Sequence, residues 1–158
     1  MYKFILTLIT LVSLLQSADK LNINVGKDFN ENFSYETSYS YNQNFNLLNS
    51  NNIFTRVSYT YLDNENLKIY AFDPLVFSYN IIDDLSLELS VGLTYLSDKY
   101  ISDKDFGMHF QFKDTASLVW SLSKDIDIQT SYTHYSNASL DKDNDGINLL
   151  SLGMAYKF

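Results

Sequence analysis

Leu85–Tyr95 reads LSLELSVGLTY, and in this stretch apolar residues alternate with polar or small ones at every position. Successive side chains of a β-strand point to opposite faces, so the stretch predicts a strand with one apolar and one polar face. The same period of two recurs over residues 35–41, 57–61, 126–133 and 150–158. Together with 13 Tyr and 11 Phe residues, this alternation predicts an all-β protein.

Clusters of Asn, Asp, Ser and Lys separate the alternating stretches, for example at residues 49–52, 63–66 and 97–105. Pro74 falls inside one stretch, where it predicts a bulge or a break in strand pairing. No linker or change of composition indicates a second domain. We therefore expect eight strands, at about residues 21–29, 33–43, 53–62, 67–79, 86–97, 109–122, 126–137 and 148–158.

Two architectures fit strands of this kind, a soluble antiparallel sandwich and a membrane β-barrel. Strand length favours the barrel, because about 10 to 13 residues suit a tilted strand that crosses a bilayer. The chain has no cysteine, and closure of a barrel stabilises a sheet without disulfides by pairing every edge. The polar face also suits a polar lumen, since it carries Glu36, Arg56, Glu88, Asp127, Gln129 and Lys157. We expect an eight-stranded antiparallel transmembrane β-barrel of the bacterial outer membrane, with the sandwich as the alternative.

The first 18 residues have the pattern of a secretory signal peptide. Lys3 supplies a short positive region, a mostly apolar stretch runs from Phe4 to Leu15, and the small residues Ser17 and Ala18 follow. An apolar stretch of about 12 residues is shorter than the roughly 20 that a membrane helix needs. The expected organisation is a cleaved signal over residues 1–18 and a single barrel domain over residues 19–158.

His134 and Ser136 are two residues apart in a predicted strand, so their side chains point to the same face. A base beside a hydroxyl is the minimum requirement of a serine hydrolase. The pair shares the parity of Ile126, Ile128 and Tyr132, and we therefore expect it to face lipid. With both chain ends of the barrel in the periplasm, this strand ends at the extracellular rim and places the pair in the outer leaflet.

Polar groups on a lipid-facing wall are costly unless they are partnered, which indicates a functional role for His134 and Ser136. The other interpretation is that both lie in the headgroup zone, where polar residues cost little. Asn148 on the next predicted strand has the parity of Leu150 and Leu152. It is therefore expected to face outward as well, beside the pair.

The last 25 residues resemble the C-terminal signature of the PagL-type lipid A 3-O-deacylases. The resemblance is carried by HYSNASL at residues 134–140, NDGIN at residues 144–148 and YKF at residues 156–158. It implies an eight-stranded outer-membrane barrel that hydrolyses the ester-linked acyl chain at the 3-position of lipid A. It also implies that the partners are lipid A of lipopolysaccharide and membrane lipids. It further implies that the enzyme needs no cofactor and that a homodimer is possible.

By position, the resemblance implies that Ser136 is the nucleophile and His134 the general base. It further implies that the oxyanion is held by the side chain of Asn144 and a backbone N–H near Ser139. Ser139 stands where a glycine is expected, which would restrict the loop that forms this oxyanion hole.

Asn148 stands where the family pattern has a glutamate. An asparagine carbonyl orients the imidazole, but it adds no negative charge to stabilise the charged ring. Two nearby carboxylates, Asp143 and Asp145, are the alternative acids. An active esterase, a catalytically silent barrel of the same family and an unrelated OmpX-like structural barrel are the three functions that remain open.

The net charge of −8 argues against a nucleic-acid partner. Residues 141–146 read DKDNDG, as at the start of an EF-hand loop, but the twelfth position is Leu152 where a glutamate is needed. We therefore expect no metal site of that kind, while weak bridging of calcium between these aspartates and lipid phosphates stays open.

Overall fold

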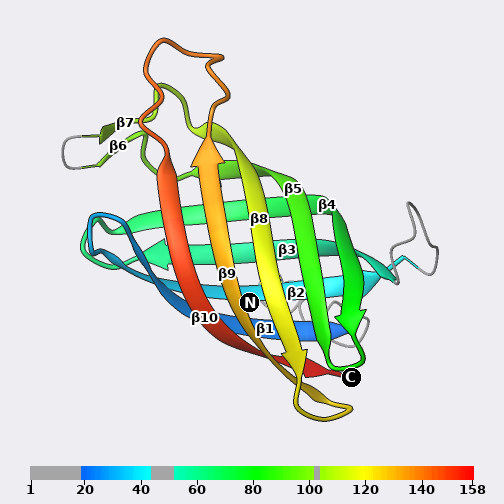
Figure 1. Cartoon of the computed structure of the whole chain (residues 1–158). Helices are drawn as coiled ribbons and strands as arrows, with labels where there is room; N and C mark the ends of the chain where they lie inside the picture. Colours follow the sequence, from blue (N-terminus) through cyan, green and yellow to red (C-terminus); the bar gives the residue numbers. More distant parts are fainter. Residues whose placement is uncertain (1–18, 44–51, 102–103) are drawn as a thin grey trace, which may run out of the picture.

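The computed structural model describes residues 19–43, 52–101 and 104–158, and the eight long strands in these ranges close into one antiparallel barrel (Figure 1). Neighbouring strands pair in chain order, and the last strand pairs with the first. The barrel strands are β1 (Lys20–Asp28), β2 (Phe33–Asn42), β3 (Asn52–Leu62), β4 (Leu67–Ile82), β5 (Leu85–Leu96), β8 (Phe110–Ser121), β9 (Ile126–Ser136) and β10 (Ile147–Lys157). The predicted signal peptide, residues 1–18, lies outside the described residues.

The prediction of an all-β transmembrane barrel is confirmed, and the soluble sandwich is not observed. Every predicted strand is present, with its bounds within one residue except at the end of β4, which continues to Ile82. The irregularity predicted at Pro74 is also confirmed, because the pairing of β4 with β5 shifts between Phe72 and Leu75. Proline has no backbone N–H to donate to the neighbouring strand. The bulge places Pro74 outside the regular pairing, so no ladder hydrogen bond is lost there.

A short hairpin was not predicted from the sequence. It consists of β6 (Tyr100–Ile101) and β7 (Lys104–Asp105), and it lies in the connection between β5 and β8. Strands of two residues are too short to show a period in the sequence.

The barrel wall is apolar on the outside and polar on the inside. In β9, Ile126, Ile128 and Tyr132 are exposed on the outer face, whereas Asp127 and Gln129 are buried in the interior. Exposed aliphatic or aromatic side chains occur on each of the other barrel strands as well. This is the pattern of a barrel whose outer face contacts lipid. Over the described ranges, no helix is long and apolar enough to span a membrane.

Charged side chains fill the middle of the lumen as ion pairs. Glu88 lies 3.0 Å from Nζ of Lys20 and 2.5 Å from a guanidinium nitrogen of Arg56. Nζ of Lys113 lies 3.2 Å from the carboxylate of Asp73. All five side chains are buried, and each charge has a partner of opposite sign. The pairing offsets the desolvation that burial of these charges would otherwise cost.

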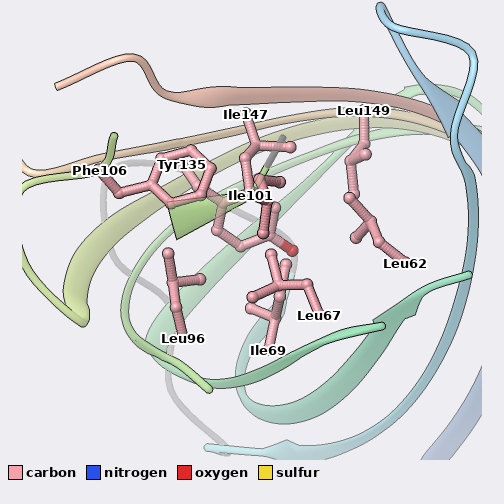
Figure 2. Packing of buried hydrophobic residues seen from close by; sticks show 9 residues of the cluster. All are labelled: Leu62, Leu67, Ile69, Leu96, Ile101, Phe106, Tyr135, Ile147 and Leu149. Carbon is pink, nitrogen blue, oxygen red and sulfur yellow. The ribbon is translucent and has the colours of Figure 1, made fainter. Parts of the chain in front are cut away.

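A cluster of buried apolar residues lies in the barrel interior at the end where β9 leads into β10 (Figure 2). It comprises Leu62, Leu67, Ile69, Leu96, Ile101, Phe106, Tyr135, Ile147 and Leu149. The same end carries the connections at residues 97–109 and 137–146, whereas tight turns at residues 83–84 and 122–125 lie at the other (Figure 1). Outer-membrane barrels have long extracellular loops and short periplasmic turns, so this end is the extracellular rim.

Candidate active site

His134 and Ser136 lie at the extracellular end of β9 on the outward face, as the alternation predicted. Both are partly exposed, while Tyr135 between them is buried in the apolar cluster. Ser136 is the last residue of β9 and is paired with Phe112 of β8. The candidate base and nucleophile therefore share one face of one strand, on the wall of the barrel just below the rim.

Asn148 makes the closest polar contact of the imidazole. Nδ1 of His134 lies 2.7 Å from Oδ1 of Asn148, which is the residue opposite His134 on β10. Because an amide oxygen only accepts hydrogen bonds, Nδ1 carries the proton in this contact. The lone pair is then on Nε2, which is the nitrogen required to take a proton from a serine hydroxyl.

Tyr132 also takes part in this contact, although no role for it in the site followed from the sequence. Its hydroxyl donates a hydrogen bond of 2.7 Å to the same Oδ1 of Asn148. Tyr132 precedes His134 by two residues and so lies on the same face of β9. The spacing of two residues placed Tyr132 on the same face as His134 in the sequence. It did not identify the partner of the hydroxyl, because Asn148 lies on the neighbouring strand.

Gly146 packs against the imidazole from the loop before β10. Its φ of +63° is in the left-handed region, which favours glycine. A Cβ at this position would lie 3.1 Å from the carbonyl oxygen of Tyr135 and 3.4 Å from Cε1 of His134. The glycine thus lets the loop backbone approach the edge of the ring and limit its movement.

The turn after β9 contains the residues expected to form an oxyanion hole. Ala138 and Ser139 have φ values of +53° and +62°, and the N–H of Leu140 donates to the carbonyl of Asn137 at 3.0 Å. These are the features of a type I′ turn, whose two central positions favour Gly, Asn or Asp. The left-handed φ at Ser139 is a physical reason for the glycine expected at this position.

Replacing Ser139 with glycine is expected to raise the free energy of unfolding by about 1 kcal/mol, because the strain of a left-handed residue is relieved. Urea unfolding of the purified barrel in detergent measures the effect. Ser151, in the middle of β10, provides the matched control. Ser151→Gly should lower the stability by about 0.5–1 kcal/mol, because glycine weakens a strand interior. Equal destabilisation by both substitutions would contradict the proposed strain.

Asn144 and Asn137 hold the loop in place. Oδ1 of Asn144 accepts the N–H of Asn137 at 2.9 Å, which leaves its amide nitrogen as a hydrogen-bond donor. The buried amide of Asn137 donates to the carbonyls of Phe106 at 3.0 Å and Asp143 at 2.7 Å. Asn137 therefore ties the end of β9 to the two extracellular connections at residues 97–109 and 137–146. No role for it followed from the sequence, because these acceptors are backbone atoms.

The two alternative acids lie elsewhere in the loop. Asp143 and Asp145 are exposed, and the carboxylate of Asp145 accepts the N–H of Asp105 at 2.6 Å. The structure thus brings Asn148, rather than either aspartate, to Nδ1 of His134. Within the part of the chain that the structure describes, no three His, Cys, Asp or Glu residues are grouped to hold a metal ion.

Two lysines of the connection between β5 and β8 place positive charge near this loop. Nζ of Lys104 donates to the carbonyl of Gly146 at 3.5 Å, and Nζ of Lys99 donates to that of Gly107 at 3.3 Å. A hydrogen bond with Tyr100 raises the pKa of Lys99 above its ordinary value. Lys99 is therefore cationic at neutral pH.

An apolar groove runs along the outer wall beside Ser136. Its volume is about 480 Å³, and Phe112, the residue paired with Ser136, is part of its lining. Leu140 of the loop after β9 also lines it. The other lining side chains come mainly from the outward faces of β3, β4 and β5, and include Val57, Tyr70, Phe72 and Leu93. The groove faces the lipid, and its volume and apolar lining suit part of an aliphatic chain.

A family model described as lipid A 3-O-deacylase (PagL) matches residues 20–157. A lipid A deacylase PagL of Bordetella bronchiseptica is 33% identical over 72 residues, which make up 46% of this chain and 40% of that protein. The matched stretch thus spans less than half the length of that curated relative.

The solved structures that resemble the fold include an outer-membrane enzyme and a barrel domain of another outer-membrane protein. A crystal structure described as the outer membrane enzyme PagL matches with a TM-score of 0.77 and 20% identity, covering 88% of this chain and 99% of that one. The N-terminal β-barrel domain of Pseudomonas aeruginosa OprF matches with a TM-score of 0.65 and 15% identity, covering 88% and 96%. The first and last barrel strands both lie within the range matched by the family model, and the barrel fold is that of outer-membrane proteins. This chain is an outer-membrane β-barrel that belongs to the lipid A 3-O-deacylase (PagL) family.

Proposed function

We propose that this protein is an outer-membrane esterase that removes the 3-O-linked hydroxyacyl chain from lipid A. The observation that carries the proposal is the pair of His134 and Asn148 beside Ser136 on the outward wall, in a chain of the PagL family. Lipid A lies in the outer leaflet, so the substrate would enter the site laterally from the membrane. A homodimer remains a prediction.

The reaction is an acyl transfer through Ser136. Nε2 of His134 takes the hydroxyl proton as Oγ attacks the ester carbonyl, and a tetrahedral oxyanion forms. The side-chain amide of Asn144 and the backbone N–H of Ser139 donate to this oxyanion. The intermediate collapses to an acyl-serine as the bond to the sugar oxygen breaks, and His134 gives its proton to that oxygen, which leaves as the sugar hydroxyl. Water, activated by His134, then releases the 3-hydroxy fatty acid, and no cofactor is needed.

The apolar groove supports this substrate class. Phe112 lines the groove and is paired with Ser136, so an acyl chain lying there would bring its ester close to the nucleophile. The positive charges of Lys99 and Lys104 at the rim suit the phosphates of lipid A, although the chain as a whole is acidic. Apolar wall and cationic rim match the two halves of such a lipid.

Asn148 favours a second candidate, a catalytically silent barrel of the same family. Its neutral amide fixes the tautomer of His134, but it provides only a dipole to stabilise the imidazolium that forms during the reaction. Release of 3-hydroxy fatty acid from lipopolysaccharide by the purified barrel in detergent, followed by mass spectrometry, distinguishes the two. Steady release supports the esterase, and no release from a folded barrel supports the silent barrel.

Replacing Asn148 with glutamate is expected to increase the rate of release at least about tenfold, because a carboxylate stabilises the imidazolium. Asn148→Gln is the matched control, since it has the same length as glutamate and no charge. The same mass-spectrometric assay measures both variants. Equal rates for the glutamate and glutamine variants would show that the missing charge does not limit catalysis.

A further inference from the structure

Asp114 of β8 is a carboxylate on the lipid-facing wall. It is exposed and has the parity of the outward-facing Phe112, Ala116 and Leu118. Every other Asp or Glu on the barrel strands of the described chain is directed into the interior; these residues are Asp28, Glu36, Asp73, Glu88 and Asp127. A charge on the lipid face is unfavourable unless it has a partner, so an isolated carboxylate at this position requires an explanation.

The strand register explains why a carboxylate lies at this position. Asp114 is directly opposite His134 in the pairing of β8 with β9, and Asn148 is directly opposite His134 in the pairing of β9 with β10. Directly opposed side chains on one face of a sheet have Cβ atoms about 4.5–5.5 Å apart. The register therefore places His134 between Asn148 on one neighbouring strand and Asp114 on the other.

Asp114 also lies in apolar surroundings. It lines a shallow groove of about 310 Å³ with Leu89, Val91, Ala116 and Tyr132. In the membrane, acyl chains rather than water cover this part of the wall. Opposite charges attract each other several times more strongly in such surroundings than they do in water.

We propose that Asp114 provides the negative charge that Asn148 lacks, by stabilising the imidazolium form of His134 from the neighbouring strand. The inference rests on the proposed esterase function. The acid of a Ser/His/acid triad both orients the imidazole and stabilises its charged form, and here two residues share these roles. Asn148 orients the ring and fixes its tautomer through Nδ1, while Asp114 acts across space as a positioning residue that need not touch the substrate.

The other polar groups around the ring do not provide this charge. On β9 the hydroxyl of Tyr132 is bonded to Asn148, and on β10 the facing group is the neutral amide of Asn148 itself. From β7, Nζ of Lys104 reaches the carbonyl of Gly146 beside the ring, and its positive charge disfavours the imidazolium. The carboxylate of Asp145 in the loop is bonded to a backbone N–H of β7.

The test compares Asp114→Asn in two backgrounds, the natural chain and the Asn148→Glu variant. In the natural chain, kcat for fatty acid release should fall at least about tenfold with KM unchanged, because the charge matters only when the imidazolium forms. In the Asn148→Glu background the loss should be less than about twofold, since the carboxylate is restored at Nδ1. Asp114→Glu should retain most of the rate, because it keeps the carboxylate on the same strand face.

Asp125→Asn is the matched control, because Asp125 is a partly exposed aspartate in a turn at the periplasmic end, and its carboxylate lies 3.8 Å from Nζ of Lys124. Gel mobility with and without boiling checks that each variant folds as a barrel. Equal losses in both backgrounds, or an unchanged rate in the natural chain, would overturn the inference while the esterase function stands. If neither the natural chain nor Asn148→Glu released fatty acid, although both were folded, the proposed function would be overturned together with the inference.

Discussion

Replacing Ser136 with alanine is expected to lower the release of 3-hydroxy fatty acid from lipopolysaccharide by at least about 10³-fold. The side-chain oxygen of Ser136 is the atom that would bond to the acyl group, and it lies on the outward face with His134. His134→Gln should cause a loss of similar size, because a nucleophile and its base act as a unit. Mass spectrometry of the released fatty acid measures both variants.

Ser131 is the matched control for this substitution. It lies on the same strand but points into the lumen, where its hydroxyl accepts a hydrogen bond of 2.8 Å from Ser117. Ser131→Ala should cost about 1 kcal/mol of stability and leave the rate of release within about twofold of the natural chain. An undiminished rate in Ser136→Ala would show that the nucleophile lies elsewhere.

Replacing Glu88 with alanine is expected to lower the free energy of unfolding by about 3–5 kcal/mol. Glu88 is the shared partner of Lys20 and Arg56 in the barrel interior, at 3.0 and 2.5 Å. All three side chains are buried, so removing the carboxylate leaves positive charge in the lumen with less compensation. Urea unfolding of the barrel in detergent, followed by gel mobility, measures the loss.

Lys124 provides the comparison for Glu88. Its pair with Asp125 is exposed at the periplasmic end, with 3.8 Å between the charged atoms. Lys124→Ala should change the stability by less than about 0.5 kcal/mol, because exposed pairs contribute little. If Glu88→Ala unfolded at the same urea concentration as the natural chain, the ion pairs of the lumen would not be a main source of stability.

The fold was predictable because alternate side chains of a membrane-barrel strand face the lipid and the lumen. Apolar and polar residues therefore alternate along each strand. The alternation over Leu85–Tyr95 sufficed to indicate β5, and parity placed His134 and Ser136 on the lipid face. What the alternation lacks is the identity of the neighbour across each strand pair. The contact of Glu88 with Lys20 joins residues 68 positions apart, and only the register of the closed barrel brings them together.

The site, like the fold, was predictable where residues are close in sequence and not where they meet across strands. The spacing of His134, Ser136 and Asn148, read with the family resemblance, was enough to predict that they form the site, and the structure places them close together on the outward face. Tyr132 and Asp114 were missed because each acts on a residue of an adjacent strand, so their roles follow from register rather than from spacing along the chain. Asn137 was missed for a related reason, since its amide holds backbone carbonyls of two loops.

The most direct test of the proposed activity is mass spectrometry of lipid A from a Gram-negative host that lacks a lipid A deacylase and expresses this chain. Loss of the mass of one 3-hydroxyacyl chain, absent when Ser136→Ala is expressed at the same level, is the predicted result. An unchanged lipid A profile, from cells whose outer membrane contains the folded barrel as judged by its heat-dependent gel mobility, would contradict the proposal.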